Sequence, residues 1–337
     1  MNTSSLICEK SHRPKYLQIV QLITENIESG ILKKGDKLPS INEVAVSNTV
    51  AKETVTKAYA ILRQNGTVKA QHGKGFYVAK SNAKKSLNIF VLFDTFNAYK
   101  EILYTSLKDS FPTDTRFSIY FHHYNLDQFK SLIEDNIGNY NHYVIMAHFD
   151  TDVSRIVSLI PRDKLLLIDK DMPKLKGDYS AVFQDFENDI YSALCSCNGE
   201  LKKYKRLNVV TGDPLFQYIP NGVLNGIKQF SLEKHIKLSF LTMVSAKSVR
   251  QNEAYLVFND SDIIKLIKIC EIEKWKLSRD VGLIAFDETP LKEILCGGIT
   301  VMSTDFKAMG KKAAELILTK QVKKIKNHFA LIKRKTL

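Results

Sequence analysis

Residues 38–78 read LPSINEVAVSNTVAKETVTKAYAILRQNGTVKAQHGKGFYV, a stretch that holds two helix signals and one hairpin signal. Ser40 is a favoured N-cap, and Glu43 three residues later completes a capping box, which predicts a short helix over Ile41–Ser47. The pair Asn48-Thr49 breaks this helix. A further helix is predicted over Lys52–Gln64, and its apolar face consists of Val55, Ala58, Tyr59 and Leu62.

The flanking segments complete a small domain. Upstream, residues 14–29 repeat apolar side chains every three or four positions, which predicts an amphipathic helix that stops at Gly30. Downstream, residues 67–70 and 75–79 predict two short strands around a glycine-containing turn. Three helices followed by a hairpin make a winged helix-turn-helix, and we assign residues 1–79 to it.

The positive charge of the chain is concentrated in this first part. The 337 residues carry a formal net charge of +13. Residues 1–85 contribute 14 Lys or Arg against 6 Asp or Glu, so this quarter accounts for +8 of the total. Because neutralised phosphates release counterions, a basic domain favours a polyanionic partner such as duplex DNA. A basic surface that is only solvated is the alternative.

Six short segments within residues 12–79 follow one another in a characteristic order. They are Leu38-Pro39-Ser40, Val44-Ala45, Thr54-Val55, Lys57-Ala58, Asn65-Gly66 and the wing His72-Gly73-Lys74-Gly75-Phe76-Tyr77-Val78. This ordered set resembles the GntR family of bacterial transcription regulators. The resemblance implies binding of double-stranded operator DNA. A small helical domain whose hairpin contacts proteins is the alternative.

In such a domain the third helix enters the major groove with its N-terminal residues toward the base edges. The resemblance and the exposed helix faces indicate the following DNA-binding residues: Ser40, Asn42, Lys52, Glu53, Thr54, Thr56, Lys57, His72, Gly73 and Lys74. In the family, the positions of Asn42, Lys52 and Thr56 are commonly Arg. Since Arg forks onto guanine and Asn favours adenine, the operator should differ from those of Arg-rich relatives.

The remainder of the chain has a different pattern. Residues 80–87 are polar and basic and predict a linker. Beyond them, short apolar runs alternate with helical patterns, first over residues 87–169 and again over residues 207–318. This alternation predicts an α/β fold with doubly wound parallel sheets in two lobes, which we assign to residues 88–337. Ligands of such sheets bind beyond the carboxyl ends of the strands, in the cleft between the lobes.

Several segments of this part have a recognisable order. They are Leu167-Ile168-Asp169-Lys170, residues 221–227, Phe258-Asn259-Asp260, residues 281–291 (VGLIAFDETPL), Thr300-Val301 and residues 309–316 (MGKKAAEL). They resemble the effector domain of LacI/GalR-type regulators, which is related to periplasmic binding proteins. The resemblance implies a monosaccharide effector and a homodimer. The LacI hinge helix is absent from the sequence, and the GntR-type head and linker stand in its place.

Polar and aromatic side chains near strand ends are the candidate ligand-binding residues: Phe96, Asn97, Tyr99, His123, His148, Asp185, Tyr218, Asn221, Asp260 and Asp287. Carboxylates and amides pair with sugar hydroxyls, and aromatic faces pack on C–H patches. The family position that matches Asn221 is usually an Arg that clamps the ligand, so its loss favours a neutral monosaccharide over a sugar phosphate. An Asp at a strand end can instead cap a helix, and His123 or His148 can be an ordinary surface or core residue.

Other classes of function find less support in the sequence. It contains no GK[ST] phosphate-binding loop and no G-x-S-x-G elbow, which disfavours an enzyme. An enzyme that acts on a sugar or related metabolite is the alternative to a regulator. The five cysteines form no CxxC pair, and we expect reduced thiols without a metal or cofactor. The sequence shows neither a signal peptide nor a long apolar run, so we expect no membrane association. A bacterial cytoplasmic protein, bound to the nucleoid when on DNA, is the expectation.

Overall fold

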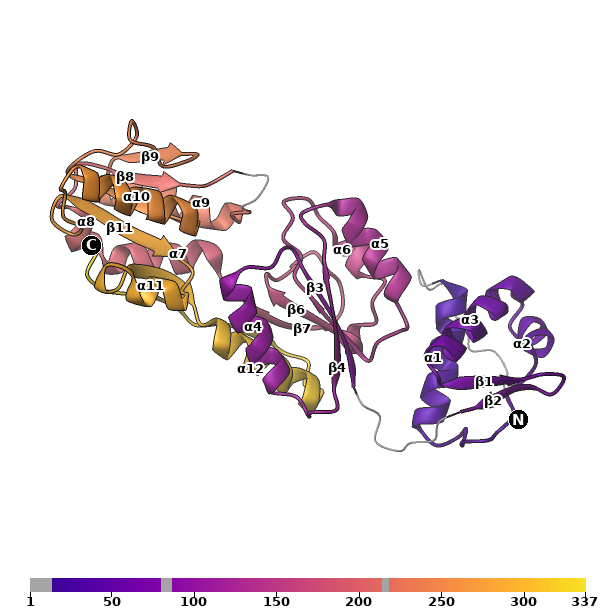
Figure 1. The fold of residues 1–337 in the computed structure, drawn as a ribbon. Helices are drawn as coiled ribbons and strands as arrows, with labels where there is room; N and C mark the ends of the chain where they lie inside the picture. The colour runs from indigo at the N-terminus through magenta and orange to yellow at the C-terminus, as the bar shows by residue number, and fades with distance from the viewer. Residues whose placement is uncertain (1–13, 80–86, 214–217) are drawn as a thin grey trace.

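The computed structural model describes residues 14–79, 87–213 and 218–337. Figure 1 shows these residues as three bodies in a row, which we call the head (residues 14–79), lobe 1 and lobe 2. The predicted linker lies outside the described residues except for Leu87. Within the described part of the chain, no helix combines the length and apolar character needed to cross a bilayer.

The described head has three helices and one hairpin. Their bounds are α1 (Lys15–Glu28), α2 (Ile41–Ser47), α3 (Lys52–Gln64), β1 (Val68–Gln71) and β2 (Gly75–Val78). Both hydrogen bonds of the capping box are present, because Ser40 Oγ accepts from the Glu43 amide at 3.2 Å and Glu43 Oε2 accepts from the Ser40 amide at 2.6 Å. The predicted winged helix-turn-helix is confirmed, with element ends shifted by at most one residue.

Lobe 1 is built on a sheet with strand order β13-β7-β6-β5-β3-β4, in which all neighbours are parallel. Its strands are β3 (Asn88–Phe93), β4 (Arg116–Phe121), β5 (His142–Ile145), β6 (Leu165–Asp169), β7 (Ser180–Phe183) and β13 (Lys324–Lys326). One face packs against α5 (Leu126–Asn136) and α6 (Ser154–Val157), and the other against α4 (Ala98–Asp109) and α12 (Phe306–Thr319). A short 3-10 turn, Arg162–Lys164, precedes β6. Buried side chains of β3 alternate between the two faces, as the pleat of a covered strand requires.

Lobe 2 repeats this architecture with strand order β14-β12-β11-β10-β8-β9. Its strands are β8 (Leu207–Val210), β9 (Leu238–Leu241), β10 (Glu253–Val257), β11 (Val281–Phe286), β12 (Thr300–Thr304) and β14 (Phe329–Ile332). Only the β12–β14 pair of this described sheet is antiparallel. The helices are α7 (Phe186–Ser196), α8 (Asn198–Leu201), α9 (Asn221–Lys234), α10 (Asp260–Ile272) and α11 (Pro290–Ile294), followed by the 3-10 turn Leu295–Gly297. The predicted two-lobed α/β fold is confirmed.

Over the described residues, the chain passes between the lobes three times: from β7 to α7, from β12 to α12 and from β13 to β14. The sequence pattern placed the whole series over residues 207–318 in one lobe, which is wrong for α12, because α12 returns to lobe 1, as does the unpredicted strand β13. The passages are hydrogen-bonded to one another. The Asn327 amide donates to the Phe183 carbonyl at 2.7 Å, and the Asp305 amide donates to the His328 carbonyl at 2.9 Å.

The sequence pattern missed the strands β7, β12, β13 and β14 and the helices α7, α8 and α11. β7 and β14 have four residues and β13 has three, which leaves little sequence in which a period can be recognised. The predicted helix over residues 153–159 is a single turn, α6. The missed helix α7 follows β7 directly and carries the chain into lobe 2.

Two glycines allow pairs of helices to approach closely. A Cβ on Gly226 of α9 would lie 2.3 Å from the Glu187 carbonyl oxygen of α7. A Cβ on Gly310 of α12 would lie 2.6 Å from the Leu103 carbonyl oxygen of α4. Both glycines belong to segments that carry the LacI resemblance, so part of that resemblance has a packing cause.

We predict that Gly226→Ala lowers the free energy of unfolding by about 1–3 kcal/mol, because backbone atoms must separate to admit the methyl group. This loss should exceed the gain of up to about 1 kcal/mol that alanine brings to a helix. Gly199→Ala in α8 is the matched control, since no atom lies within 4 Å of its Cβ position. Urea denaturation of both variants and the wild type measures the effect, and equal stability of the two variants would contradict the prediction.

Candidate functional site

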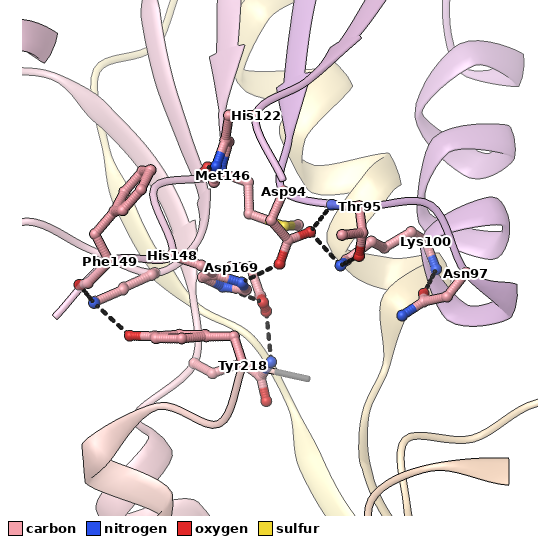
Figure 2. Close-up of polar contacts among 12 residues, drawn as sticks. Asp94, Thr95, Asn97, Lys100, His122, Met146, His148, Phe149, Asp169 and Tyr218 are labelled. Carbon is pink, nitrogen blue, oxygen red and sulfur yellow. Dashed lines mark hydrogen bonds and ion pairs between the residues drawn. The ribbon is translucent and has the colours of Figure 1, made fainter. Parts of the chain in front are cut away.

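Three neighbouring strands of lobe 1 end at the same edge of the sheet and carry charged side chains there. Asp94 follows β3, His148 lies beyond the end of β5, and Asp169 is the last residue of β6. Parallel strands bring their carboxyl ends together, so these side chains meet although they are far apart in sequence. Figure 2 shows the three residues with Lys100 of α4.

The four side chains form a buried ionic cluster. Asp94 forms an ion pair with Lys100, and His148 Nδ1 lies 2.8 Å from Asp94 Oδ2. His148 Nε2 lies 3.0 Å from Asp169 Oδ2. Burial lowers the pKa of His148, but the adjacent carboxylates of Asp169 and Asp94 raise it more, so the net shift is upward. Burial raises the pKa of Asp94, yet His148 and Lys100 hold it well below its usual range. Two carboxylates are thus balanced by two cations.

A cavity of about 30 Å³ lies against this cluster and between the lobes. That volume is far below the range for small-molecule sites, about 300–1,000 Å³, so entry of a ligand of sugar size requires the lobes to move apart. Its lining is aromatic and acidic and comprises Tyr99, His148, Asp169, Gln184, Phe186, Tyr218, Ile219, Pro220, Phe258, Phe286, Asp287 and Phe306. Residues of both lobes contribute, so movement of one lobe against the other changes the cavity.

Asp287 and Gln184 present oxygens to the cavity that have no hydrogen-bond partner among the described residues, namely Asp287 Oδ1 and Gln184 Oε1. Burial raises the pKa of Asp287 to about 7, and the nearby cation of Lys292 opposes this rise only in part. The backbone of Asp287 has a φ of +59°, which turns the residue out of line with the end of β11. Unpaired buried acceptors are costly, so the cavity favours a ligand that donates hydrogen bonds.

A segment of lobe 2 is held against lobe 1 beside the cavity. The hydroxyl of Tyr218 donates to Asp150 Oδ1 at 3.1 Å, and Asn221 Nδ2 donates to the same oxygen at 3.1 Å. Lys170 Nζ donates to the Tyr218 hydroxyl at 3.1 Å and to the Phe149 carbonyl at 2.6 Å (Figure 2). The ring of Tyr218 stacks on His148 with centroids 5.2 Å apart. These contacts join the lobes directly across the cleft.

Four of the ten predicted ligand-binding residues line the cavity: Tyr99, His148, Tyr218 and Asp287. The other six lie elsewhere: Phe96, Asn97, His123, Asp185, Asn221 and Asp260. Asn97 caps α4, and Phe96 and His123 are exposed. Asp185 pairs with Lys326, Asp260 pairs with Lys292, and Asn221 makes the contact between lobes described above.

Sequence reasoning missed several residues of the site. Asp94 follows an apolar strand and Asp169 ends one, so the rule that selected His148 applies equally to them. Lys100 gave no signal, because a lysine on an amphipathic helix is normally exposed, whereas here it is 1% exposed. The aromatic lining also gave none. Phe186, Phe258, Phe286 and Phe306 read as ordinary core residues and converge only in the folded chain.

The predicted DNA-binding residues lie on α2, on α3 and at the hairpin of the head, and nine of the ten are exposed. Lys52, Glu53, Thr56 and Lys57 are exposed on α3, whereas Thr54 is half-buried. Ser40 and Asn42 are exposed at the start of α2, and His72, Gly73 and Lys74 form the exposed tip of the hairpin. A groove between α2 and the hairpin is lined by Lys37, Asn42 and Lys74, among others. The Lys57 ammonium lies 4.2 Å from the ring centroid of Tyr16, which draws it toward α1.

Comparison with known proteins defines the class of each part. Residues 15–78 match the family model "Bacterial regulatory proteins, gntR family". The head is therefore a GntR-type winged helix-turn-helix, and the two lobes have the fold of the LacI-type and periplasmic-binding-protein-like regulators. The chain joins these two parts, as the sequence predicted.

Individual relatives match either the head or the lobes. The HTH-type transcriptional repressor YtrA of Bacillus subtilis (strain 168) is 41% identical over 78 residues, which are 23% of this chain and 59% of that protein. The trehalose repressor of Escherichia coli matches with a TM-score of 0.61 and 10% identity, over 74% of this chain and 100% of its own. A LacI family transcriptional regulator from Lactobacillus casei with bound glucose matches with a TM-score of 0.60 and 13% identity, over 74% of this chain and 99% of its own.

The pKa of Asp287 predicts a pH-dependent stability. A carboxyl with a pKa near 4 in the unfolded chain and about 7 in the folded chain takes up a proton on folding between these values. The free energy of unfolding therefore falls as the pH rises through this window. Asp287→Asn lacks this proton, so its stability relative to the wild type should rise with pH, by up to about 1.4 kcal/mol per pH unit, and level off above pH 7.

Urea denaturation at a series of pH values between 5 and 8 measures this difference. Asp178→Asn removes an exposed carboxyl and is the matched control, because it should run parallel to the wild type. An Asp287→Asn curve that also runs parallel to the wild type would show that Asp287 titrates normally.

Proposed function

We propose that this protein is a transcription regulator whose affinity for duplex DNA is controlled by a small neutral polyhydroxylated molecule, a monosaccharide. The observation that carries the proposal is the combination, in one chain, of an exposed polar helix face and a small cavity between two lobes. Residues 1–79 would bind DNA, residues 80–87 would link, and residues 88–337 would bind the effector and form a homodimer. The relatives found are regulators, which favours binding over catalysis.

The geometry of α3 supports DNA binding. Its inner face is fully packed, since Val55, Ala58 and Leu62 are 0% exposed. Its outer face presents Lys52 and Thr56 near the N-terminal end, the end from which recognition helices contact base edges. The hairpin tip adds Lys74 beside two glycines, a combination that suits close approach to a backbone of phosphates.

The chemistry of the cavity supports a neutral ligand with several hydroxyl groups. Asp287 Oδ1 and Gln184 Oε1 are acceptors that hydroxyl hydrogens can satisfy. The cations at the site are already engaged, because His148 and Lys100 bind carboxylates and Lys170 binds a carbonyl and Tyr218. Among the described lining residues there is thus no uncommitted cation for a phosphate. Aromatic faces suit the C–H patches of a sugar ring, and two of the similar structures are named for or contain sugars.

Regulation would follow from closure of the lobes around the ligand. Tyr218 and Asn221 of lobe 2 contact Asp150 of lobe 1, so a ligand in the adjacent cavity changes how firmly these contacts hold. In a homodimer, lobe movement would change the separation of two heads on a pseudo-palindromic operator. A ligand acts on DNA affinity only through its preference for one lobe arrangement, and such coupling is typically about 1–3 kcal/mol.

For DNA binding, we predict that Lys52→Ala weakens affinity about tenfold for a duplex that the full-length protein selects from a random library, and less for a scrambled duplex. Lys268→Ala, on the exposed surface of α10, removes the same charge far from the head and is the control. Fluorescence anisotropy titration at fixed salt measures both. Equal weakening on both duplexes would assign Lys52 to phosphate contact, and no weakening would remove it from the interface.

For the effector, we predict that one or more neutral monosaccharides raise the melting temperature of the full-length protein, whereas their phosphate esters do not. A ligand at 100 times its dissociation constant stabilises by about 2.7 kcal/mol. Asp287→Ala should abolish the shift, while Asp178→Ala, an exposed carboxyl, should keep it. Thermal-shift screening reports this directly, and stabilisation by phosphate esters alone would contradict a neutral ligand.

A further inference from the structure

The helix α1 has two apolar sides that serve different bodies. Ile19, Val20, Ile23 and Ile27 belong to the core of the head. Leu17 does not belong to that core, yet it is only 1% exposed, because it packs within the core cluster of lobe 1. A leucine that is buried against another body contributes to holding the two bodies together.

The surface that receives Leu17 is the loop after α5. A Cβ on Gly138 would lie 3.4 Å from Leu17 Cδ2 and 3.6 Å from Val20 Cγ1, so α1 is in close contact with the backbone of this loop. Gly138 has a φ of +87°, a conformation that glycine adopts readily. Asn65 Nδ2 donates to the Gly138 carbonyl at 3.4 Å, which adds a polar contact at the C-terminal end of α3.

The docking leaves the proposed recognition face free. Ile61, in the last turn of α3, packs against the cluster of lobe 1, as does Tyr16 of α1. Lys52 and Thr56, nearer the N-terminal end of α3, are exposed. Figure 1 shows α1 and α3 on the side of the head that faces lobe 1. The helix α3 is therefore held at its C-terminal end while its N-terminal half remains accessible.

The loop that receives the head is attached to the strand that leads to the cavity. The hydroxyl of Tyr143, on β5, accepts from the Gly138 amide at 2.9 Å and donates to the Asn136 carbonyl at 2.9 Å. Beyond its other end, β5 leads to His148 in the cavity lining. The docking loop and the cavity thus lie at opposite ends of one buried strand, so lobe 1 connects them rigidly.

We propose that Leu17, Ile61 and Asn65 dock the head on the Gly138 loop of its own lobe 1, and that this contact fixes the direction of α3 relative to the cleft. The head and lobe 1 then move as one body, and lobe 2 is the part that moves against them. The proposed docking interface lies within a single chain. Its first test requires no DNA.

Leu17→Glu should lower the equilibrium constant for docking about tenfold to a hundredfold, since it removes the burial of one leucine. Glutamate near a helix N-terminus is favourable, so α1 should remain folded. Ile31→Glu, a substitution of the same kind at a head residue that is 69% exposed, is the control. Small-angle scattering should give a larger radius of gyration, and hydroxyl-radical footprinting a more reactive Ile61, for Leu17→Glu only. Continued protection of Leu62 would show that the head is intact.

Wild-type scattering and wild-type reactivity of Leu17→Glu would overturn the proposal. Protection of Ile61 that is lost on dilution would also overturn it, because the head would then dock on a second copy of the chain. On selected DNA, Leu17→Glu should weaken binding to a two-half-site duplex and leave a single half-site unaffected. Equal effects on both duplexes would overturn the role in directing α3. If the wild type binds no duplex, the proposed function fails, and scattering alone still decides the docking.

Discussion

Charge compensation inside lobe 1 is the constraint on which the rest of the structure depends. A buried carboxylate without a partner costs several kcal/mol, and Asp94 and Asp169 are both almost fully buried. Lys100 and His148 balance them, and His148 contacts both carboxylates at once. These contacts fix the carboxyl ends of β3, β5 and β6 and attach α4 to them. One wall of the cavity is therefore rigid before any ligand arrives.

The opposite wall is different in kind. It is supplied by lobe 2 and consists mainly of aromatic rings and of Asp287, whose Oδ1 has no hydrogen-bond partner among the described residues and whose charge Lys292 compensates only in part. In this cavity the charges of one wall are paired, whereas the other wall carries an acceptor oxygen without a partner. The cavity therefore favours a ligand that donates a hydrogen bond. The hydrogen bonds of Tyr218 and Asn221 to Asp150 stabilise the closed arrangement of the lobes without a ligand. A ligand therefore needs only a small difference in affinity between the closed and open arrangements to shift the equilibrium.

Lobe 1 is the central body of the chain, because it contacts both the head and lobe 2. It contacts the head through α1 and the Gly138 loop, and it contacts lobe 2 through three hydrogen-bonded passages and the cleft. Asn327, which is 2% exposed, illustrates how tightly the passages are joined, because its side chain donates to both Thr304 Oγ1 and the Asp305 carbonyl. Movement between the lobes must bend these passages together, which favours a hinge over independent shifts.

The head could be read from the sequence almost to the residue, because its signals are local. The capping box at Ser40 and Glu43 and the glycine turn of the hairpin each specify the conformation of a few neighbouring residues. The alternation of strands and helices likewise follows from local periodicity, and so did the two-lobed fold. Tyr99, His148, Tyr218 and Asp287 could be found by the rule that ligands bind at strand ends.

Only the tertiary structure decided which elements share a lobe and which side chains share a cavity. The apolar stripe of α12 indicates that the helix packs against another element, but not that it returns to lobe 1 and packs against α4. Lys100, the four phenylalanines and Leu17 carry no local sign of their roles. Their positions depend on contacts between residues far apart in the chain, and the energy of such contacts is not encoded in any short stretch of sequence.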